Sequence, residues 1–319
     1  MYYEANWEST LKNQVNPQTI PEDFETFWLT ETEKMRRIPI QITRKRLSTP
    51  YDKTFYTDLI TFNTHDKTVV EALFSCPVNA ATPLPCVAEF HGGSGSKRFM
   101  PDILATGVCC FSIDVRSQGG TTIDRAEYYS GDRMGGLMTC GILDKNEFYM
   151  KNIYLDAIRT MDVIASLPEV DADQIFTYGG SQGGALSIVA SALSGRSRKC
   201  YTAVTSFCCL KERTELGSGV FNSTHQFLCK YPAHTDKAMQ TLSYFDINNM
   251  VSLLKTPTVF CVGLADPICL PKFVYSAYSH AACEKTLYMY PFTPHCIPED
   301  FKLTVFHEFA ALVPGGSSV

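Results

Sequence analysis

Ser181 lies at the centre of a glycine-rich hexapeptide that could supply a nucleophile, Gly179-Gly180-Ser181-Gln182-Gly183-Gly184. The pattern G-x-S-x-G is typical of a catalytic serine when a strand precedes it and a helix follows it. Residues 175–178 are a predicted strand and residues 185–193 a predicted apolar helix, so that context is present. We therefore predict a nucleophilic serine, the alternative being an ordinary serine in a glycine-rich turn.

The residue types in this nucleophile turn (residues 179–184) follow from its geometry. The chain must reverse sharply between strand and helix, which strains the backbone of the serine. Gly179 and Gly183 have no Cβ that could clash in so tight a turn. The serine oxygen is then expected to project above the sheet edge, near the positive end of the following helix.

A serine hydroxyl is a weak nucleophile, so it needs a base and an acid that orients the base. After such a turn the chain order is Ser, then Asp or Glu, then His. Three histidines follow a plausible acid, namely His280, His295 and His307. His295 lies in a loop after the last predicted strand, whereas the other two fall inside predicted helices. We therefore expect His295 to be the base, rather than a simple loop histidine.

Asp266 comes directly after a predicted strand, residues 258–263. Loops at the carboxyl ends of strands are where such sheets collect functional groups. Asp266 is thus the expected acid, although Pro267 also allows it to be an aspartate that begins a turn. Asp246 has no strand before it and is the weaker candidate.

The oxyanion that forms during attack on an ester carbonyl should meet two backbone N–H groups. One donor is expected from Gln182, the residue after the nucleophile. The other is expected from the segment His91-Gly92-Gly93-Ser94-Gly95, here the oxyanion loop, with Gly93 as the donor. The alternative is a flexible glycine loop with no electrostatic role.

The elements that must hold these residues alternate along the chain. Short apolar runs separated by helical patterns indicate a mostly parallel central sheet with helices on both faces, which is the α/β class. We predict a single domain over residues 1–319, with residues 1–45 as an N-terminal extension. Residues 210–250 are more polar and are expected to form an excursion over the sheet.

Composition excludes several other classes of protein. The chain has 319 residues, 45 % of them hydrophobic, and a net charge of −5 with no block of like charge. No nucleic-acid or membrane partner is therefore expected. The 13 cysteines include no C-x-x-C pair, so neither a metal nor another cofactor is expected. The first residues show no signal-peptide pattern, which favours a cytoplasmic protein.

With these residues in place, the chain resembles the acetyl xylan esterase and cephalosporin C deacetylase family, carbohydrate esterase family seven, of the α/β-hydrolase fold. The resemblance covers almost the whole chain and is far more specific than G-x-S-x-G. Its segments are Pro21-Glu-Asp-Phe-Glu-Thr-Phe-Trp28, Asp114-Val-Arg-Ser-Gln-Gly119, Met138-Thr-Cys-Gly-Ile-Leu-Asp144 with Asp156-Ala-Ile-Arg159, Gly180-Ser-Gln-Gly-Gly184, Thr241-Leu-Ser-Tyr-Phe-Asp246 and Val262-Gly-Leu-Ala-Asp-Pro-Ile-Cys-Leu-Pro271.

The resemblance implies a serine esterase that removes acetyl groups from acetylated xylo-oligosaccharides and from cephalosporin C. It implies an intracellular enzyme without metal that forms a homo-oligomer, often a hexamer whose active sites face an internal space. By the same match Ser181, Asp266 and His295 are the catalytic triad, and the N–H groups of Gly93 and Gln182 form the oxyanion hole.

Three positions depart from the family pattern. Gly93 stands where the family usually has an aromatic residue, which removes a side chain that would help wall the acyl pocket. Ser117 replaces the middle glycine of an Arg-Gly-Gln stretch. Cys296, rather than Glu, follows the expected catalytic histidine, and the pair His307-Glu308 inside a helix is interpreted as a decoy. These departures bear on substrate range more than on reaction type.

Two rival functions remain open at this stage. One is a general short-chain carboxylesterase or a peptidase of the same fold, and the other is a non-catalytic member that binds a ligand or partner. A cysteine hydrolase is disfavoured because no cysteine occupies the nucleophile turn. A further hypothesis is that Cys140, Cys269 or Cys296, which lie beside motif residues, is redox-sensitive.

Overall fold

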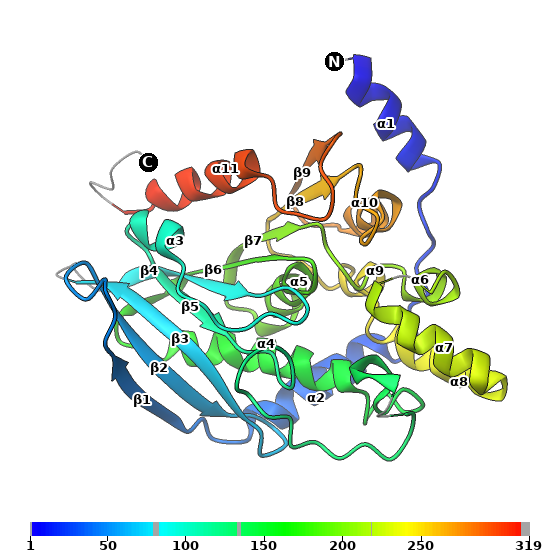
Figure 1. Ribbon diagram of the computed structural model, residues 1–319, viewed down its shortest axis with the longest axis horizontal. Coiled ribbons are helices and arrows are strands. Elements are labelled where there is room, and N and C mark those ends of the chain that lie inside the picture. The colour runs from blue at the N-terminus through cyan, green and yellow to red at the C-terminus, as the bar shows by residue number, and fades with distance from the viewer. Residues whose placement is uncertain (1, 79–82, 133–134, 218, 314–319) are drawn as a thin grey trace.

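A nine-stranded sheet runs through the centre of the computed structural model, which describes residues 2–78, 83–132, 135–217 and 219–313 (Figure 1). Met1, in the predicted N-terminal extension, and Ser218, in the predicted excursion over the sheet, lie outside the described residues. The strands are Ile42–Leu47 (β1), Phe55–Asn63 (β2), Val69–Pro77 (β3), Leu84–Phe90 (β4), Cys109–Ile113 (β5), Val170–Gly180 (β6), Ser197–Ala203 (β7), Thr258–Gly263 (β8) and Lys285–Tyr290 (β9).

The spatial order of the strands is β1-β2-β3-β5-β4-β6-β7-β8-β9. From β5 to β9 all neighbours are parallel, while β1, β2, β3 and β5 pair antiparallel. The expected mostly parallel sheet is therefore confirmed, with an antiparallel edge that the sequence pattern did not reveal. Residue 45, where the N-terminal extension was expected to end, lies inside β1.

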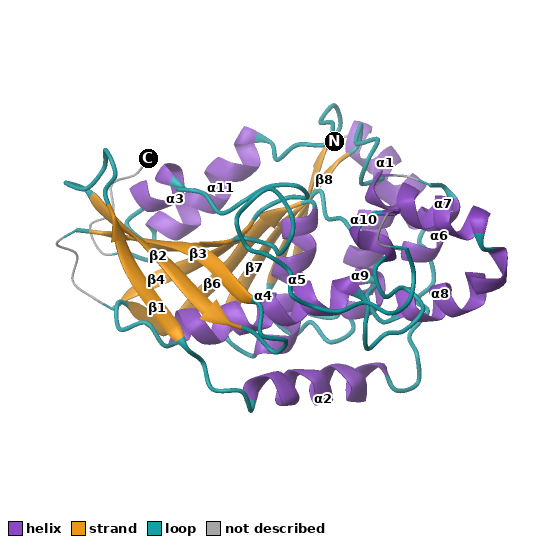
Figure 2. Cartoon of the chain, turned by 60° about the horizontal axis from the view of Figure 1, so that its bottom comes forward, coloured by secondary structure: helices purple, strands orange, loops and turns teal. Residues whose placement is uncertain are grey.

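Helices cover both faces of the sheet (Figure 2). α4 and α5 pack on one face, with α2 outside α4, while α3 and α11 lie on the opposite face. The helices are Tyr2–Lys12 (α1), Phe24–Arg36 (α2), Pro101–Ala105 (α3), Tyr149–Ala165 (α4), Gln182–Ser194 (α5), Leu210–Glu215 (α6), Asn222–Lys230 (α7), Thr235–Ser243 (α8), Ile247–Met250 (α9), Pro271–His280 (α10) and Glu299–Ala310 (α11).

The strands at the centre of the sheet are mostly apolar because both of their faces are covered. Every residue of β4, β5 and β8 is buried. The charged residue of these three strands is Glu89, fully buried in β4, which accepts hydrogen bonds from Arg98 Nη2 at 2.6 Å and Ser112 Oγ at 2.6 Å. A buried carboxylate is tolerated only when it is paired in this way.

The carboxyl ends of these strands place the loops that carry the candidate residues next to one another. Phe90 at the end of β4 pairs with Gly179 of β6, so the oxyanion loop and the nucleophile turn begin side by side. Gly263 of β8 pairs with Tyr290 of β9, so the loops that contain Asp266 and His295 also leave the sheet together.

Residues 210–250 contain α6 to α9. α7 packs against a short 3₁₀ turn at Leu137–Thr139, and α9 packs against α5 and α10. Trp28 of α2 is fully buried and donates a hydrogen bond from its indole nitrogen to the carbonyl of Tyr244 at 2.9 Å, which joins α2 to this segment. Among the described residues, no helix is both long enough and apolar enough to cross a membrane.

Candidate active site

Ser181 occupies a strained backbone position between β6 and α5. Its φ of 57° and ψ of −122° lie outside the regions that side-chain-bearing residues normally adopt. A Cβ at Gly183 would stand 1.9 Å from the carbonyl oxygen of Phe90, and one at Gly179 would stand 2.4 Å from the carbonyl carbon of Gly183. Glycine is therefore required at both positions, as the sequence analysis expected. Strain of this kind concentrates at functional sites, where surrounding contacts hold it.

The side chains of Ser181, His295 and Asp266 form a continuous hydrogen-bonded chain. His295 Nε2 lies 3.1 Å from Ser181 Oγ, and His295 Nδ1 lies 2.8 Å from Asp266 Oδ2. These side chains come from three separate loops, after β6, β9 and β8. The arrangement has the nucleophile-to-base and base-to-acid contacts that activate a serine.

Asp266 is held rigidly beneath the histidine. It is 3 % exposed, and its Oδ1 accepts hydrogen bonds from the backbone N–H groups of Ile268 at 2.8 Å and Cys269 at 2.9 Å. Its other oxygen, Oδ2, is thereby left to face His295. The carboxylate can hold the imidazole in one tautomer, with the proton on Nδ1 and the lone pair on Nε2.

The weaker candidates lie in structural settings. Asp246 caps the N-terminus of α9 and accepts hydrogen bonds from the backbone N–H groups of Cys209, Leu210 and Asn248 at 2.8, 2.7 and 2.8 Å. His280, at the end of α10, donates from Nε2 to the carbonyl of Asn16 at 2.8 Å. His307 lies within α11. None of the three belongs to the hydrogen-bonded chain of Ser181.

The backbone N–H groups of Gly93 and Gln182 are available as donors. Within the described ranges, neither has an acceptor in the chain. A Cβ on the neighbouring Gly92 would stand 3.9 Å from Ser181 Cβ, which places the oxyanion loop against the nucleophile. Gln182 is the first residue of α5, where the helix dipole favours negative charge.

His91 stabilises the start of the oxyanion loop. Its side chain is 1 % exposed, its Nδ1 donates to the carbonyl of Gly92 at 2.7 Å, and its Nε2 accepts from the N–H of Val115 at 3.0 Å. This pairing requires a neutral ring with its proton on Nδ1. Burial accordingly lowers the pKa of His91 from its ordinary value.

Two further residues lie near the site: Gln118, to which the sequence analysis assigned no role, and Cys269, which it named as one of three cysteines that could be redox-sensitive. The side chain of Gln118 exchanges two hydrogen bonds with the side chain of Gln182, at 2.8 and 2.9 Å. Cys269 places its sulfur near His295. A carboxylate oxygen of Asp266, the sulfur of Cys269 and a ring nitrogen of His295 all lie within 4.8 Å of one another. Gln118 occurs in a segment that carries the family resemblance, but nothing in the sequence indicates its contact with Gln182.

The thiol, imidazole and carboxylate together form a donor set that could take a divalent cation. The guanidinium of Arg213 opposes such binding, because its Nη2 lies 3.5 Å from the sulfur of Cys269 and Arg213 is 1 % exposed. The other two cysteines that were hypothesised to be redox-sensitive differ in exposure, since Cys140 is buried and Cys296 is exposed.

Comparisons with known proteins bear on the family to which the chain belongs. A family model described as acetyl xylan esterase matches residues 8–311. The structure is similar to the acetyl xylan esterase from Paenibacillus sp. R4, with a TM-score of 0.89 and 31 % identity over 96 % of this chain and 99 % of that one. It is also similar to acetyl xylan esterase 1 from Thermoanaerobacterium sp. JW/SL YS485, with a TM-score of 0.89 and 25 % identity over 95 % of this chain and 98 % of that one.

A curated relative, the acetyl esterase Axe7A of Xylanibacter ruminicola, is 23 % identical over 286 residues, which are 86 % of this chain. The match spans 63 % of the length of that relative. The family model covers nearly the whole chain, and the similar structures share its α/β-hydrolase fold. The chain therefore belongs to the acetyl xylan esterase family of carboxylic ester hydrolases.

Proposed function

We propose that this chain is a serine esterase that removes acetyl groups from acetylated xylo-oligosaccharides and related small acetyl esters such as cephalosporin C. The observation that carries the proposal is the hydrogen-bonded chain from Ser181 Oγ through His295 to Asp266, with contacts of 3.1 and 2.8 Å. Membership of the acetyl xylan esterase family supports the choice of acyl group and of substrate class.

In the first half of the reaction His295 Nε2 takes the proton of Ser181 Oγ as the oxygen attacks the acetyl carbonyl. The imidazolium that forms is stabilised by Asp266, which keeps its charge. The N–H groups of Gly93 and Gln182 donate to the oxyanion. When the tetrahedral intermediate collapses, His295 returns the proton to the leaving alcohol, and an acetyl ester of Ser181 remains.

In the second half a water molecule replaces the alcohol. His295 removes a proton from the water as it attacks the acetyl-serine, and the same two N–H groups hold the second oxyanion. Collapse breaks the bond between the carbonyl carbon and Ser181 Oγ. Acetic acid is released, and the proton returns from His295 to the serine.

A broader short-chain carboxylesterase is the second candidate, and one observation favours it. A Cβ at Gly93 would have no atom within 4 Å, so the oxyanion loop leaves open space where a side chain could limit the acyl group. In this second candidate function, esters longer than acetate are also substrates.

The experiment that decides between them measures release of acid by the purified full chain from two kinds of substrate. Acetate release from an acetylated xylo-oligosaccharide, together with a steep fall of kcat/KM beyond acetate in a series of aryl esters, supports the deacetylase. Similar kcat/KM values from acetate to hexanoate, without release from the saccharide, support the broad carboxylesterase. Absence of turnover on every ester would contradict both and leave a ligand-binding role.

A further inference from the structure

The side-chain amide of Gln118 lies between the two halves of the proposed oxyanion hole and uses its full hydrogen-bonding capacity there. Its Oε1 accepts from the backbone N–H of Ser94 at 3.0 Å and from Gln182 Nε2 at 2.9 Å. Its Nε2 donates to Gln182 Oε1 at 2.8 Å and to the hydroxyl of Tyr149 at 3.2 Å. One amide thus joins the residue after Gly93 to the residue after Ser181.

We propose that Gln118 is a positioning residue that fixes the spacing between the N–H groups of Gly93 and Gln182. The inference rests on the proposed function, because that function assigns the oxyanion role to these two donors. Gln118 acts through Ser94 and Gln182, and the proposal assigns it no contact with the reacting atoms.

Hydrogen bonds hold the oxyanion loop, among them those of His91 at its start and a turn bond from Gly95 N–H to Gly92 O at 3.0 Å. A side chain at Gly93 would find no neighbour within 4 Å, so packing does not hold this residue. Ser94 adopts a left-handed φ of 61°, which its surroundings must enforce. Beside the bond from Ser94 to Gln118, a backbone hydrogen bond from Gly119 N–H to Gly95 O at 3.0 Å ties the same two segments together.

Catalysis by an oxyanion hole depends on donors that are already in place when charge develops. Two donors from separate loops can drift apart unless a third group spans them. A displacement of about 1 Å can lower a rate about a hundredfold. The reciprocal amide pair between Gln118 and Gln182 opposes that drift because both of its bonds would have to break together.

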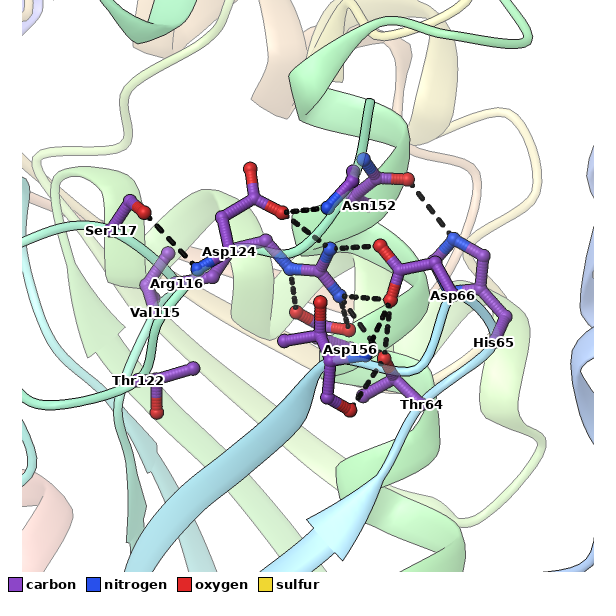
Figure 3. A network of polar contacts seen from close by, with 12 residues as sticks. Thr64, His65, Asp66, Val115, Arg116, Ser117, Thr122, Asp124, Asn152 and Asp156 are labelled. Atoms are coloured by element: carbon purple, nitrogen blue, oxygen red, sulfur yellow. Dashed lines mark hydrogen bonds and ion pairs between the residues drawn. The ribbon is translucent and has the colours of Figure 1, made fainter. Parts of the chain in front are cut away.

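Gln118 can hold the two loops in place because its own segment is fixed by the ion pairs of the neighbouring Arg116 (Figure 3). Arg116 is fully buried and binds both oxygens of Asp156, with Nε–Oδ2 at 2.6 Å and Nη2–Oδ1 at 2.7 Å. Its Nη1 also lies 3.0 Å from Asp124 Oδ1 and pairs with Asp66.

Tyr149 links Arg116 to the side chain of Gln118. Its hydroxyl donates to the carbonyl of Arg116 at 2.7 Å and accepts from Gln118 Nε2 at 3.2 Å. The path from Asp156 on α4 to the oxyanion loop therefore consists of consecutive hydrogen bonds and one short backbone segment, residues 116–118.

The test compares Gln118→Met, which keeps side-chain length and removes all four hydrogen bonds, with Gln240→Met, a matched change in the exposed part of α8. With an aryl acetate we expect Gln118→Met to lower kcat about ten- to a hundredfold with little change in KM. Gln240→Met should match the wild type. An unchanged kcat in Gln118→Met would overturn the proposal.

A charged variant adds a readout that a purely structural role would not change. Gln118→Glu keeps the size but, when ionised, cannot donate to Gln182 or Tyr149 and places negative charge near the oxyanion. Its kcat relative to the wild type should rise as pH falls and the new carboxyl takes a proton. A ratio that stays constant with pH would count against the proposal.

A double-mutant cycle tests the pair itself. Because Gln118→Met and Gln182→Ala both break the reciprocal bonds, their effects on kcat should be less than additive. Fully additive effects would contradict the proposed link. If the variant with Met at residue 118 does not fold, as judged by its thermal melt, Gln118→Glu serves in its place in the cycle. Failure of the proposed function is distinct, since the wild type itself would then show no turnover.

Discussion

The sulfur of Cys269 lies beside the imidazole of His295. This sulfur, a ring nitrogen of His295 and a carboxylate oxygen of Asp266 are all within 4.8 Å of one another. The hydrogen bond to Asp266, and next the contact with Cys269, raise the pKa of His295 above its ordinary 6.5, against the effect of burial. Burial alone would raise the pKa of the Cys269 thiol, but His295 and Arg213 lower it. In the proposed mechanism the thiol therefore shifts the pH range in which His295 acts as a base.

The first prediction concerns pH dependence. Since His295 must be neutral to accept the proton of Ser181, and its pKa is raised, kcat/KM should increase with pH with a midpoint above 6.5. Cys269→Ala removes one of the two raising influences and should move that midpoint to lower pH. Steady-state rates across a pH series check this, with Cys229→Ala, at an exposed cysteine of α7, as control. An identical midpoint in Cys269→Ala and the wild type would refute the coupling.

The second prediction concerns Ser117, which replaces a glycine of the family pattern. Ser117 adopts a left-handed φ of 53°, and its hydroxyl accepts a hydrogen bond from the N–H of Asp124 at 3.1 Å. Ser117→Ala loses the bond and keeps the strain, whereas Ser117→Gly loses the bond and relieves the strain. The Gly variant should exceed the Ala variant in free energy of unfolding by about 1 kcal/mol, measured by urea denaturation. The reverse order would show that the strain is unimportant.

The third prediction contrasts two glycines of the site. Gly93→Ala adds a Cβ to open space, so the free energy of unfolding should stay constant or rise by up to about 1 kcal/mol. Gly183→Ala drives a Cβ to within 1.9 Å of the carbonyl oxygen of Phe90 and should cost at least about 3 kcal/mol. Thermal and urea denaturation of both variants test this, and similar losses would mean that the space at Gly93 is closed in solution.

The fourth prediction concerns the charge balance around Arg116. Arg116→Met leaves Asp66, Asp124 and Asp156 without their cation and should cost about 3–5 kcal/mol of folding free energy near neutral pH. Burial already raises the pKa of Asp156 to about 6, with Arg116 opposing the rise. Without Arg116 the carboxyls of Asp66 and Asp156 bind protons more readily, so the deficit should shrink as pH falls from about 8 to about 5. A deficit that is equal at both pH values would contradict this account.

The elements of the sheet and the order of the site residues follow from local patterns in the sequence. The predicted strand 258–263 coincides with β8, and Asp266 follows it, because an apolar run of that length fits a strand buried on both faces. The same logic places His295 in the loop after β9. Within the antiparallel edge, β1 was missed because it is almost wholly exposed and has no apolar alternation.

What could not be predicted depends on contacts between residues far apart in the chain. Gln118 meets Ser94 and Gln182, which are 24 and 64 residues away. No spacing rule connects these positions, since their approach depends on the order of β4, β5 and β6 in the sheet. The contact between Cys269 and Arg213, which are 56 residues apart, could not be predicted from the sequence either.

Release of acetate by the Ser181→Ala variant is the most direct test of the central claim, that Ser181 is the nucleophile of an acetyl esterase. Wild type, Ser181→Ala and the control Ser166→Ala, at the far end of α4, would be compared on an acetylated xylo-oligosaccharide and an aryl acetate. The account predicts that Ser181→Ala loses activity by a factor of about 10³ or more, with its thermal melt unchanged, while Ser166→Ala stays active. Acetate release by Ser181→Ala at the wild-type rate would contradict it.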